Sequence, residues 1–266
     1  MLTLIPTPIG NLQDITDRAV TKLNSCELLL CEDTRVTKQL LTLLSKQYPI
    51  SCDAKMVSFH QYNHKQRLAE IANQLKDCEV VYVSDAGMPA ISDPGAELVQ
   101  YCQQEGITYD VLPGANAAIT AFAASGFEGA FTFYGFLPKT STQKAFEQVM
   151  ENSTHTVVYE SPHRIQKTVQ SIQEYDPQRK LFLAKEISKK FQTFYYGRAR
   201  DIELKNTKGE WVVVIYKATQ GSVTLSQQEL LQLPLPLKTK SKLLARCGTQ
   251  SAKEWYNTLL NSQVEK

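Results

Sequence analysis

The chain has 266 residues, of which 42% are hydrophobic, and its formal net charge is +2 at pH 7. That length accommodates one large domain or two small ones with a sizeable core. A nearly neutral charge neither requires nor excludes a nucleic-acid partner. The six cysteines are scattered without a C-x-x-C pair, and no apolar run is long enough to span a membrane. We therefore expect a soluble, cytoplasmic protein without disulfides and without a membrane partner.

The first half of the chain alternates predicted strands and helices. Short apolar runs predict the strands, and amphipathic stretches between them predict the helices. The strands are Leu2–Pro6, Glu27–Cys31, Met56–His60, Glu79–Val83 and Thr108–Leu112, and the helices are Thr16–Cys26, Lys38–Ser45, Gln66–Leu75, Ala96–Cys102 and Ala115–Ala124. This rhythm predicts an N-terminal α/β domain, residues 1–136, with a parallel sheet covered by helices.

The rhythm changes near Phe131–Phe136, and a second, smaller α+β domain is predicted over residues 137–220. Only short links separate its later strands, so a mixed or antiparallel sheet is expected. The predicted elements are the strands Thr156–Glu160, Leu181–Lys185, Phe191–Tyr196 and Trp211–Tyr216 and the helix His163–Glu174.

The last part of the chain, residues 221–266, is predicted to be a linker and a basic helical tail. Leu233-Pro234-Leu235-Pro236 has the composition of a linker. Lys238, Lys240, Lys242 and Arg246 follow it, and then comes a short helix over Ser251–Leu260. The basic residues are either a solvated helix face or a phosphate-contacting appendage.

The loop Ser84–Gly95, between the fourth strand and its helix, is the strongest functional signal. It holds two acids, two glycines and two prolines. An ordinary strand-to-helix turn explains Asp93-Pro94-Gly95, but neither the length of the loop nor the presence of Asp85 and Gly87. Ligands bind at such strand ends in open α/β sheets, so a ligand-binding loop is predicted.

The other four strands of the first half also end in polar or turn residues. All five ends would lie along one edge of a parallel sheet, which is stronger evidence than any single motif. Asp33 or Thr34 could simply cap a helix, and Asn116 could bind a ligand or merely start one. These strand ends are Thr7–Leu12, Glu32–Arg35, His60–His64 and Pro113–Ala117.

The sequence lacks several common nucleotide-binding and catalytic motifs. No two glycines are spaced G-x-G, and there is neither a G-x-x-x-x-G-K-[ST] loop nor a G-x-S-x-G turn. His60 and His64 are four residues apart, but no third ligand completes a metal set, so no metal is expected.

In the second half, Glu160 and Arg164 are either an ion pair or part of a site, and a cleft between the two domains is the natural ligand site.

Several motifs together resemble the ribosomal RNA small-subunit 2′-O-methyltransferase family, which has the tetrapyrrole-methylase fold. The resemblance covers Leu4 to about Tyr216, and KSKLLARCG is similar to the C-terminal extension of that family. The motifs are PTPIGNLQDIT, CEDTR, SDAGMPAISDPG, LPGANAAITAFAASG, FYGFLP, YESPHR and KEISKKF.

The resemblance implies methyl transfer from S-adenosylmethionine to the ribose 2′-hydroxyl of a cytidine in the decoding region of small-subunit rRNA. The substrate would be the assembled small subunit, and the enzyme a homodimer. Carried over by position, the cofactor would contact Pro8, Ile9, Asp85, Gly87, Met88, Asn116, Ala117, Glu160 and Gly209. A tetrapyrrole or protein methylase of the same fold, or a non-catalytic ribosome-assembly factor, are the alternatives.

A ribose hydroxyl is a weak acid, so a general base is expected to take its proton. The sequence does not choose among the candidate bases Glu32, Asp33, His60, Glu160 and Lys185. Arg35, His163 and Arg164 are candidates for seating the phosphates beside the target ribose.

Overall fold

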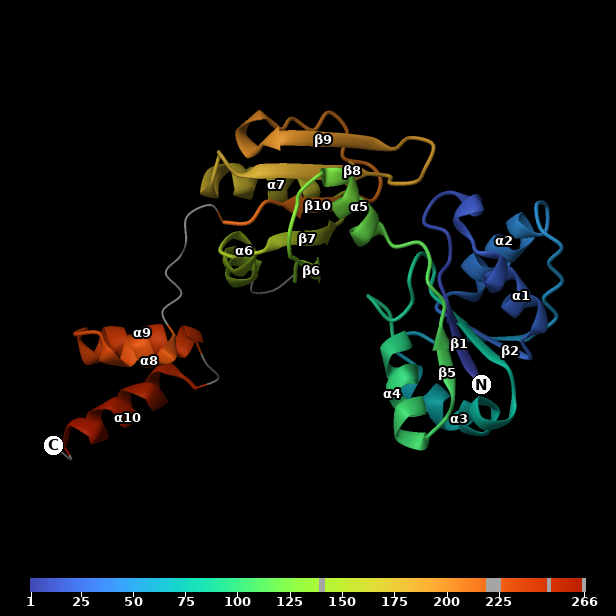
Figure 1. The fold of residues 1–266 in the computed structure, drawn as a ribbon, viewed down its shortest axis with the longest axis horizontal. Helices are drawn as coiled ribbons and strands as arrows, with labels where there is room; N and C mark the ends of the chain where they lie inside the picture. The colour runs from blue at the N-terminus through green and yellow to red at the C-terminus, as the bar shows by residue number, and fades with distance from the viewer. Residues whose placement is uncertain (139–141, 219–225, 248–249, 265–266) are drawn as a thin grey trace. The chain divides into compact units, whose positions relative to one another are not determined.

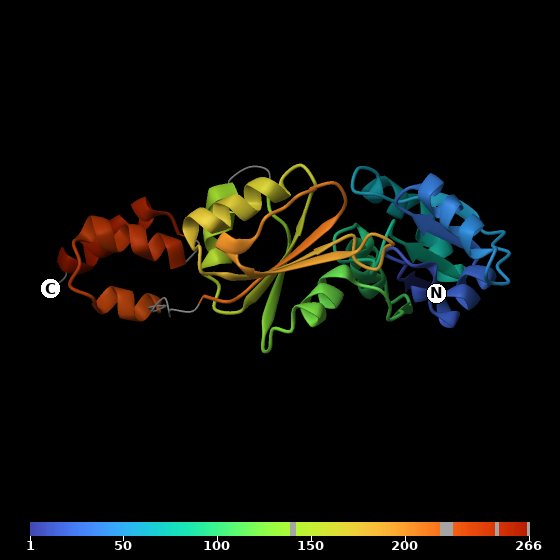
Figure 2. The same cartoon turned by 90° about the horizontal axis from the view of Figure 1, so that it is seen from above.

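The computed structural model describes residues 1–138, 142–218, 226–247 and 250–264. The chain forms two compact units, Met1–Lys217 and Ala218–Lys266, and the larger unit holds two five-stranded sheets with their helices (Figure 1, Figure 2). Within these described ranges, no helix is both long enough and apolar enough to cross a membrane.

The first sheet consists of parallel strands in the order β3-β2-β4-β1-β5. Three of them are buried along their whole length, as expected when helices cover both faces of a parallel sheet. Ile5 and Cys31 both lie beside Val83, so β1, β2 and β4 end at the same level. The strands are β1 (Leu2–Ile5), β2 (Leu28–Cys31), β3 (Lys55–Ser58), β4 (Val80–Val83) and β5 (Tyr109–Val111).

Two helices cover each face of this sheet. On one face, α1 (Asp17–Ser25) and α2 (Thr34–Leu44) bury side chains such as Leu23 and Leu44. On the other face, α3 (His64–Asp77) and α4 (Gly95–Glu105) do the same. A short 3-10 helix, η1 (Leu12–Asp14), follows β1. The predicted α/β architecture is confirmed.

The second sheet is mixed, with the order β6-β7-β10-β8-β9. β6 runs parallel to β7, and the remaining pairs are antiparallel, as expected for the later strands. Helix α5 (Ala117–Ser125) covers one face, and α6 (Thr142–Met150) and α7 (Ile165–Tyr175) cover the other. The strands are β6 (Phe131–Phe136), β7 (His155–Glu160), β8 (Lys180–Lys185), β9 (Thr193–Arg198) and β10 (Trp211–Ile215), with a 3-10 helix, η2 (Ala199–Asp201), after β9.

Some elements differ from the sequence prediction. Helix α2 begins at Thr34 rather than Lys38, because the Asp33 side chain accepts a hydrogen bond from the Arg35 backbone and caps it. The sequence reading omits α6, although its buried Phe146 and Met150 have the spacing of a helix face. The second sheet also begins earlier than residue 137, because β6 already pairs with β7.

The smaller unit contains three helices in its described part: α8 (Gln227–Gln232), α9 (Leu237–Cys247) and α10 (Ala252–Val264). Leu230, Leu244 and Leu259 form its core. The segment Leu233–Pro236 connects α8 to α9, so it lies within this unit instead of preceding it. Helix α8 has only six residues, too few for a clear helical period in the sequence.

Candidate active site

The loops that follow β1 and β4 are tied together at the carboxyl edge of the first sheet. Thr7 and Gly87 form a two-way bridge in which each backbone N–H donates to the other carbonyl oxygen over 3.0 Å. The Thr7 hydroxyl also donates to the Ser84 carbonyl oxygen over 3.3 Å. The predicted convergence of strand ends is therefore confirmed for these two loops.

Gly87 allows this close approach. Its φ is +82°, which residues with a side chain rarely adopt. A Cβ at this position would lie 3.1 Å from Ile9 Cγ2 and 3.5 Å from the Ala115 carbonyl oxygen. The absence of a side chain at Gly87 thus lets the loops after β1, β4 and β5 meet.

Carboxylates join the loop after β2 to the loop after β4. Glu32 Oε2 accepts a hydrogen bond from the Asp85 backbone N–H over 3.0 Å, and Asp85 Oδ1 accepts one from the Asp33 N–H over 3.1 Å. Burial raises the pKa of both the Glu32 and Asp85 carboxyls above their ordinary values. By contrast, hydrogen bonds from Arg35 lower the pKa of the exposed Asp33 carboxyl to about 2.

Asp93 holds the long loop after β4 in its shape. Its Oδ1 accepts hydrogen bonds from the Tyr82 hydroxyl at 2.9 Å, from Ala90 N at 3.0 Å and from Gly95 N at 2.9 Å. Ala90 has a φ of +67°, an unfavourable conformation for a residue with a Cβ. The carboxylate therefore fixes a loop that would otherwise relax.

Glu160, at the end of β7, is almost fully buried and has a partner at each oxygen. Its Oε1 lies 2.8 Å from Arg164 Nε and accepts a hydrogen bond from the Ser161 N–H over 2.7 Å. Its Oε2 accepts a hydrogen bond from the Thr168 hydroxyl over 2.8 Å. These contacts fix the turn between β7 and α7.

A cavity of about 440 Å³, here called the inter-sheet cavity, lies where these loops face the second sheet. Apolar and aromatic side chains from the second sheet form much of its wall, and carboxylates from the first sheet face them. It is lined by Ile9, Glu32, Asp85, Ala86, Ser92, Ala117, Phe136, Tyr159, Glu160, Ser161, Pro162, Ile187, Glu210, Trp211 and Val212.

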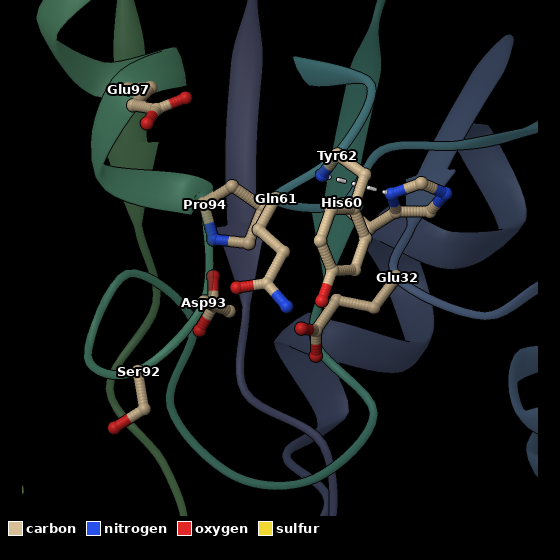
Figure 3. Close-up of a pocket in the computed structure, with 8 residues that line it drawn as sticks. All are labelled: Glu32, His60, Gln61, Tyr62, Ser92, Asp93, Pro94 and Glu97. Atoms are coloured by element: carbon tan, nitrogen blue, oxygen red, sulfur yellow. Dashed lines mark hydrogen bonds between the residues drawn. The ribbon is translucent and has the colours of Figure 1, made fainter. Parts of the chain in front are cut away.

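A second cavity of about 520 Å³, here called the Tyr62 cavity, adjoins the first and shares Glu32 and Ser92 with it. Figure 3 shows the Tyr62 ring and the Gln61 side chain near its centre, with Glu32 on one side and Asp93 on the other. The remaining lining residues are His60, Pro94 and Glu97.

The structure brings several predicted site residues together. Five of them line the inter-sheet cavity, and His60 lines the Tyr62 cavity, where its Nδ1 accepts a hydrogen bond from the Tyr62 N–H over 3.3 Å. The five are Ile9, Glu32, Asp85, Ala117 and Glu160.

Other candidates have different neighbours. The Asn116 side chain caps α5 by accepting a hydrogen bond from Ile119 N over 3.0 Å. Lys185 Nζ donates to the Asn206 carbonyl oxygen over 3.0 Å, and Arg164 Nη1 donates to the Leu137 carbonyl oxygen over 2.8 Å. Neither cavity is lined by Pro8, Asp33, Arg35, Gly87, Met88, Asn116, His163, Arg164, Lys185 or Gly209.

The aromatic and apolar wall was not predicted from the sequence, notably Tyr159, Ile187, Trp211 and Val212. These residues lie at or near the ends of second-sheet strands, where antiparallel pairing places successive strand ends on opposite edges. The edge on which each residue lies cannot therefore be assigned before the pairing is known. Within the described ranges, no group of three or more His, Cys, Asp or Glu residues is placed to hold a metal ion.

Residues 1–203 match the family of Tetrapyrrole (Corrin/Porphyrin) Methylases. The Ribosomal RNA small subunit methyltransferase I of Campylobacter fetus subsp. fetus is 41% identical over 272 residues, which cover 98% of this chain and 100% of that protein. The chain belongs to the ribosomal RNA small subunit methyltransferase I family. A protein of the same name from Helicobacter pylori (strain J99) is 41% identical over 277 residues and 96% of each chain. The family expected from the motifs is confirmed, and the chain is a methyltransferase.

Solved structures confirm the fold of this family member. The uroporphyrin-III-C-methyltransferase from Thermus thermophilus superposes with a TM-score of 0.58 at 18% identity, over 81% of this chain and 94% of that one. A diphthine synthase gives a TM-score of 0.60 at 10% identity, over 82% of this chain and 91% of that one. At these identities the likeness concerns the tetrapyrrole-methylase fold alone.

Proposed function

We propose that the protein transfers a methyl group from S-adenosylmethionine to the ribose 2′-hydroxyl of a cytidine in the decoding region of small-subunit rRNA. Relatives that match nearly the whole chain are named ribosomal RNA small subunit methyltransferases. The observation that carries the proposal is the position of Glu32, a half-buried carboxylate that lines both adjoining cavities. One cavity would hold the methyl donor and the other the acceptor.

The inter-sheet cavity fits S-adenosylmethionine in size and chemistry. Its volume of about 440 Å³ lies within the usual range of small-molecule sites. The apolar wall suits an adenine ring, and the Asp85 carboxylate suits the hydroxyls and positive charges of the cofactor. The bridge at Gly87 brings backbone close to the same space.

Gly87→Ala is expected to lower the affinity for S-adenosylmethionine by at least about fivefold. The new Cβ would press on Ile9 and strain a backbone with positive φ, a change that costs about 1–3 kcal/mol. Gly106→Ala is the matched control, because Gly106 also has a positive φ of +66° but nothing lies within 4 Å of its Cβ position. Isothermal titration of both variants checks the expectation, and equal affinities would contradict it.

Glu32 is the proposed general base. When bound, the cofactor supplies a methyl group already activated by its sulfonium, so much of the barrier is removed by alignment. As the ribose oxygen forms its bond to the methyl carbon and the carbon–sulfur bond breaks, Glu32 takes the hydroxyl proton. Glu32 Oε2 is fixed by the Asp85 N–H, which leaves Oε1 for this transfer.

The other candidate bases are less suited to this role. The pKa of Asp33, about 2, makes it a weak base. Both Glu160 oxygens are already bonded within the fold, and Lys185 is bonded to Asn206. His60 accepts a hydrogen bond at Nδ1, so its neutral ring carries the proton on Nε2 and has no free acceptor nitrogen.

The raised pKa of Glu32 predicts a pH dependence. Only the ionised carboxylate can accept a proton, so kcat should fall as pH decreases through that pKa, at a higher pH than for an ordinary glutamate. A pH profile of single-turnover methyl transfer measures this acidic limb. The limb should disappear in Glu32→Gln, and its persistence there would assign it to another group.

RNA contacts and assembly complete the proposal. Arg35 is largely exposed but its guanidinium is paired with Asp33, so it would have to share or exchange this partner to bind a phosphate. His163 is exposed, whereas Arg164 acts by holding Glu160. We place the enzyme in the cytoplasm as a homodimer that acts on the assembled small subunit. Exposed Ile119 on α5 and Tyr196 on β9 offer apolar surface for such a dimer.

Mass mapping of small-subunit rRNA from a deletion strain tests the function. We expect one ribose methyl to be missing, and purified protein with labelled S-adenosylmethionine to restore it on isolated small subunits. An unchanged modification map would contradict the proposal. No binding of S-adenosylmethionine would favour a non-catalytic assembly factor, and labelling of a protein or tetrapyrrole would favour another methylase activity.

A further inference from the structure

The Tyr62 cavity adjoins the inter-sheet cavity at one end and extends away from it at the other. Glu32 and Ser92 line both cavities, whereas His60, Gln61, Tyr62, Asp93, Pro94 and Glu97 line the Tyr62 cavity but not its neighbour. A molecule that spans the two would have its reacting group at Glu32. The rest of that molecule would lie among Gln61, Tyr62 and Glu97.

The exposed ring of Tyr62 offers a flat surface on which a base can stack. It is 87% exposed, an unusual state for a large aromatic side chain. Its backbone is nevertheless held in a tight turn: the Asn63 side chain accepts a hydrogen bond from His60 N over 2.9 Å, and Asn63 N donates to the His60 carbonyl oxygen over 3.0 Å. The His60 ring meets the Tyr62 ring edge-on, with 6.0 Å between the ring centroids. A hydrogen-bonded turn that presents an exposed aromatic ring beside a cavity is suited to stack an unpaired base.

The polar groups of the cavity favour the base over the phosphate. Glu32, Asp93 and Glu97 place carboxylates around it, and these would repel a phosphate group. Carboxylate oxygens accept hydrogen bonds from the exocyclic amine of a base such as cytosine. Uracil has a carbonyl oxygen at the same position, which leaves two acceptors facing each other.

Glu97 is the carboxylate best placed to read that amine. It projects from α4 and lines the Tyr62 cavity but not the inter-sheet cavity. His64 Nε2 lies 2.9 Å from its Oε2 and orients the side chain. The carboxylate of Asp93, by comparison, already holds the loop after β4 through three hydrogen bonds to its Oδ1.

We propose that the base of the acceptor nucleoside binds in the Tyr62 cavity, stacked on Tyr62 and with its amino group bonded to Glu97. Its ribose then lies at Glu32, beside the inter-sheet cavity. This inference rests on the proposed function and assigns the acceptor subsite within it.

Tyr62→Ala should lower kcat/KM for small subunits by about 5- to 150-fold, the range for loss of one base–aromatic stack. Binding of S-adenosylmethionine should be unchanged, and Tyr62→Trp should restore most of the activity. Tyr109→Ala is the control, because Tyr109 is an exposed tyrosine at the start of β5, on the opposite edge of the sheet. If wild-type protein transfers methyl and Tyr62→Ala is equally active, the stacking role is overturned. If wild-type protein transfers none, the proposed function itself fails.

Small subunits with uridine in place of the target cytidine test the reading of the base. Wild-type protein should prefer cytidine by at least about fivefold, because a good base contact contributes about 1–3 kcal/mol of discrimination. Glu97→Gln should reduce this ratio towards one, since an amide can both donate and accept. A ratio unchanged in Glu97→Gln would overturn the assignment of Glu97, whatever the activity of the variant.

Discussion

Replacing Glu32 with glutamine is expected to lower kcat for methyl transfer by about 10²- to 10⁴-fold, the contribution of a positioned general base. The amide can still accept the hydrogen bond from the Asp85 N–H, so the loops after β2 and β4 should keep their arrangement. The affinity for S-adenosylmethionine should therefore change little. Single-turnover transfer to small subunits, measured beside cofactor titration, separates the two quantities.

Glu203→Gln is the matched control for this experiment, because Glu203 is an exposed glutamate that lines neither cavity. Its kcat should equal that of the unaltered protein. A Glu32→Gln variant that retains kcat within about twofold would show that the proton leaves by another route. Loss of cofactor binding in that variant would instead make Glu32 a binding residue.

Glu160→Ala is expected to lower the free energy of unfolding by about 3 kcal/mol, as when one partner of a buried ion pair is removed. The change leaves Arg164 without its carboxylate and the Ser161 N–H and Thr168 hydroxyl without their acceptor. Glu160→Gln keeps an acceptor but loses the charge, so it should have an intermediate effect. Urea unfolding followed by circular dichroism measures all three proteins.

Glu174→Gln provides the control on the same helix, since Glu174 is exposed near the end of α7. It should change the free energy of unfolding by less than about 0.5 kcal/mol. If Glu160→Ala unfolds at the same urea concentration as this control, Glu160 is not a structural residue. Loss of methyl transfer without loss of stability would then return it to the candidate bases.

The carboxyl edge of the first sheet could be predicted because its chemistry follows from topology. Parallel strands all end at one edge, so polar residues after successive strands must gather there once the βα rhythm is recognised. Glu32 and Asp85 were found in this way, whereas Ile9 was proposed only from the family resemblance, and the structure places all three on the inter-sheet cavity. This inference required only the order of strands and helices, and no distance between residues.

The roles of individual side chains could not be predicted in this way. Asn116 and Asp33 have residue types that suit both a ligand contact and a helix cap, and only the hydrogen bonds show that they are caps. Glu160 and Glu32 are both carboxylates at strand ends, yet one is saturated by neighbours and the other has an oxygen left over. Tyr62 lies in the strand end His60–His64 that was singled out, but its own role could not be predicted, because exposure is not encoded in local periodicity.

The position of β1 between β4 and β5 has a consequence for biosynthesis. The first strand to leave the ribosome has neighbours that begin at Val80 and Tyr109, so its two edges are not both paired until more than a hundred residues have been made. The Thr7–Gly87 bridge needs the loop after β4. A nascent fragment that ends before this loop could therefore not form the inter-sheet cavity. Retention of a growing chain on immobilised cofactor is thus expected only after Val212, the last residue of the cavity wall, has left the ribosome.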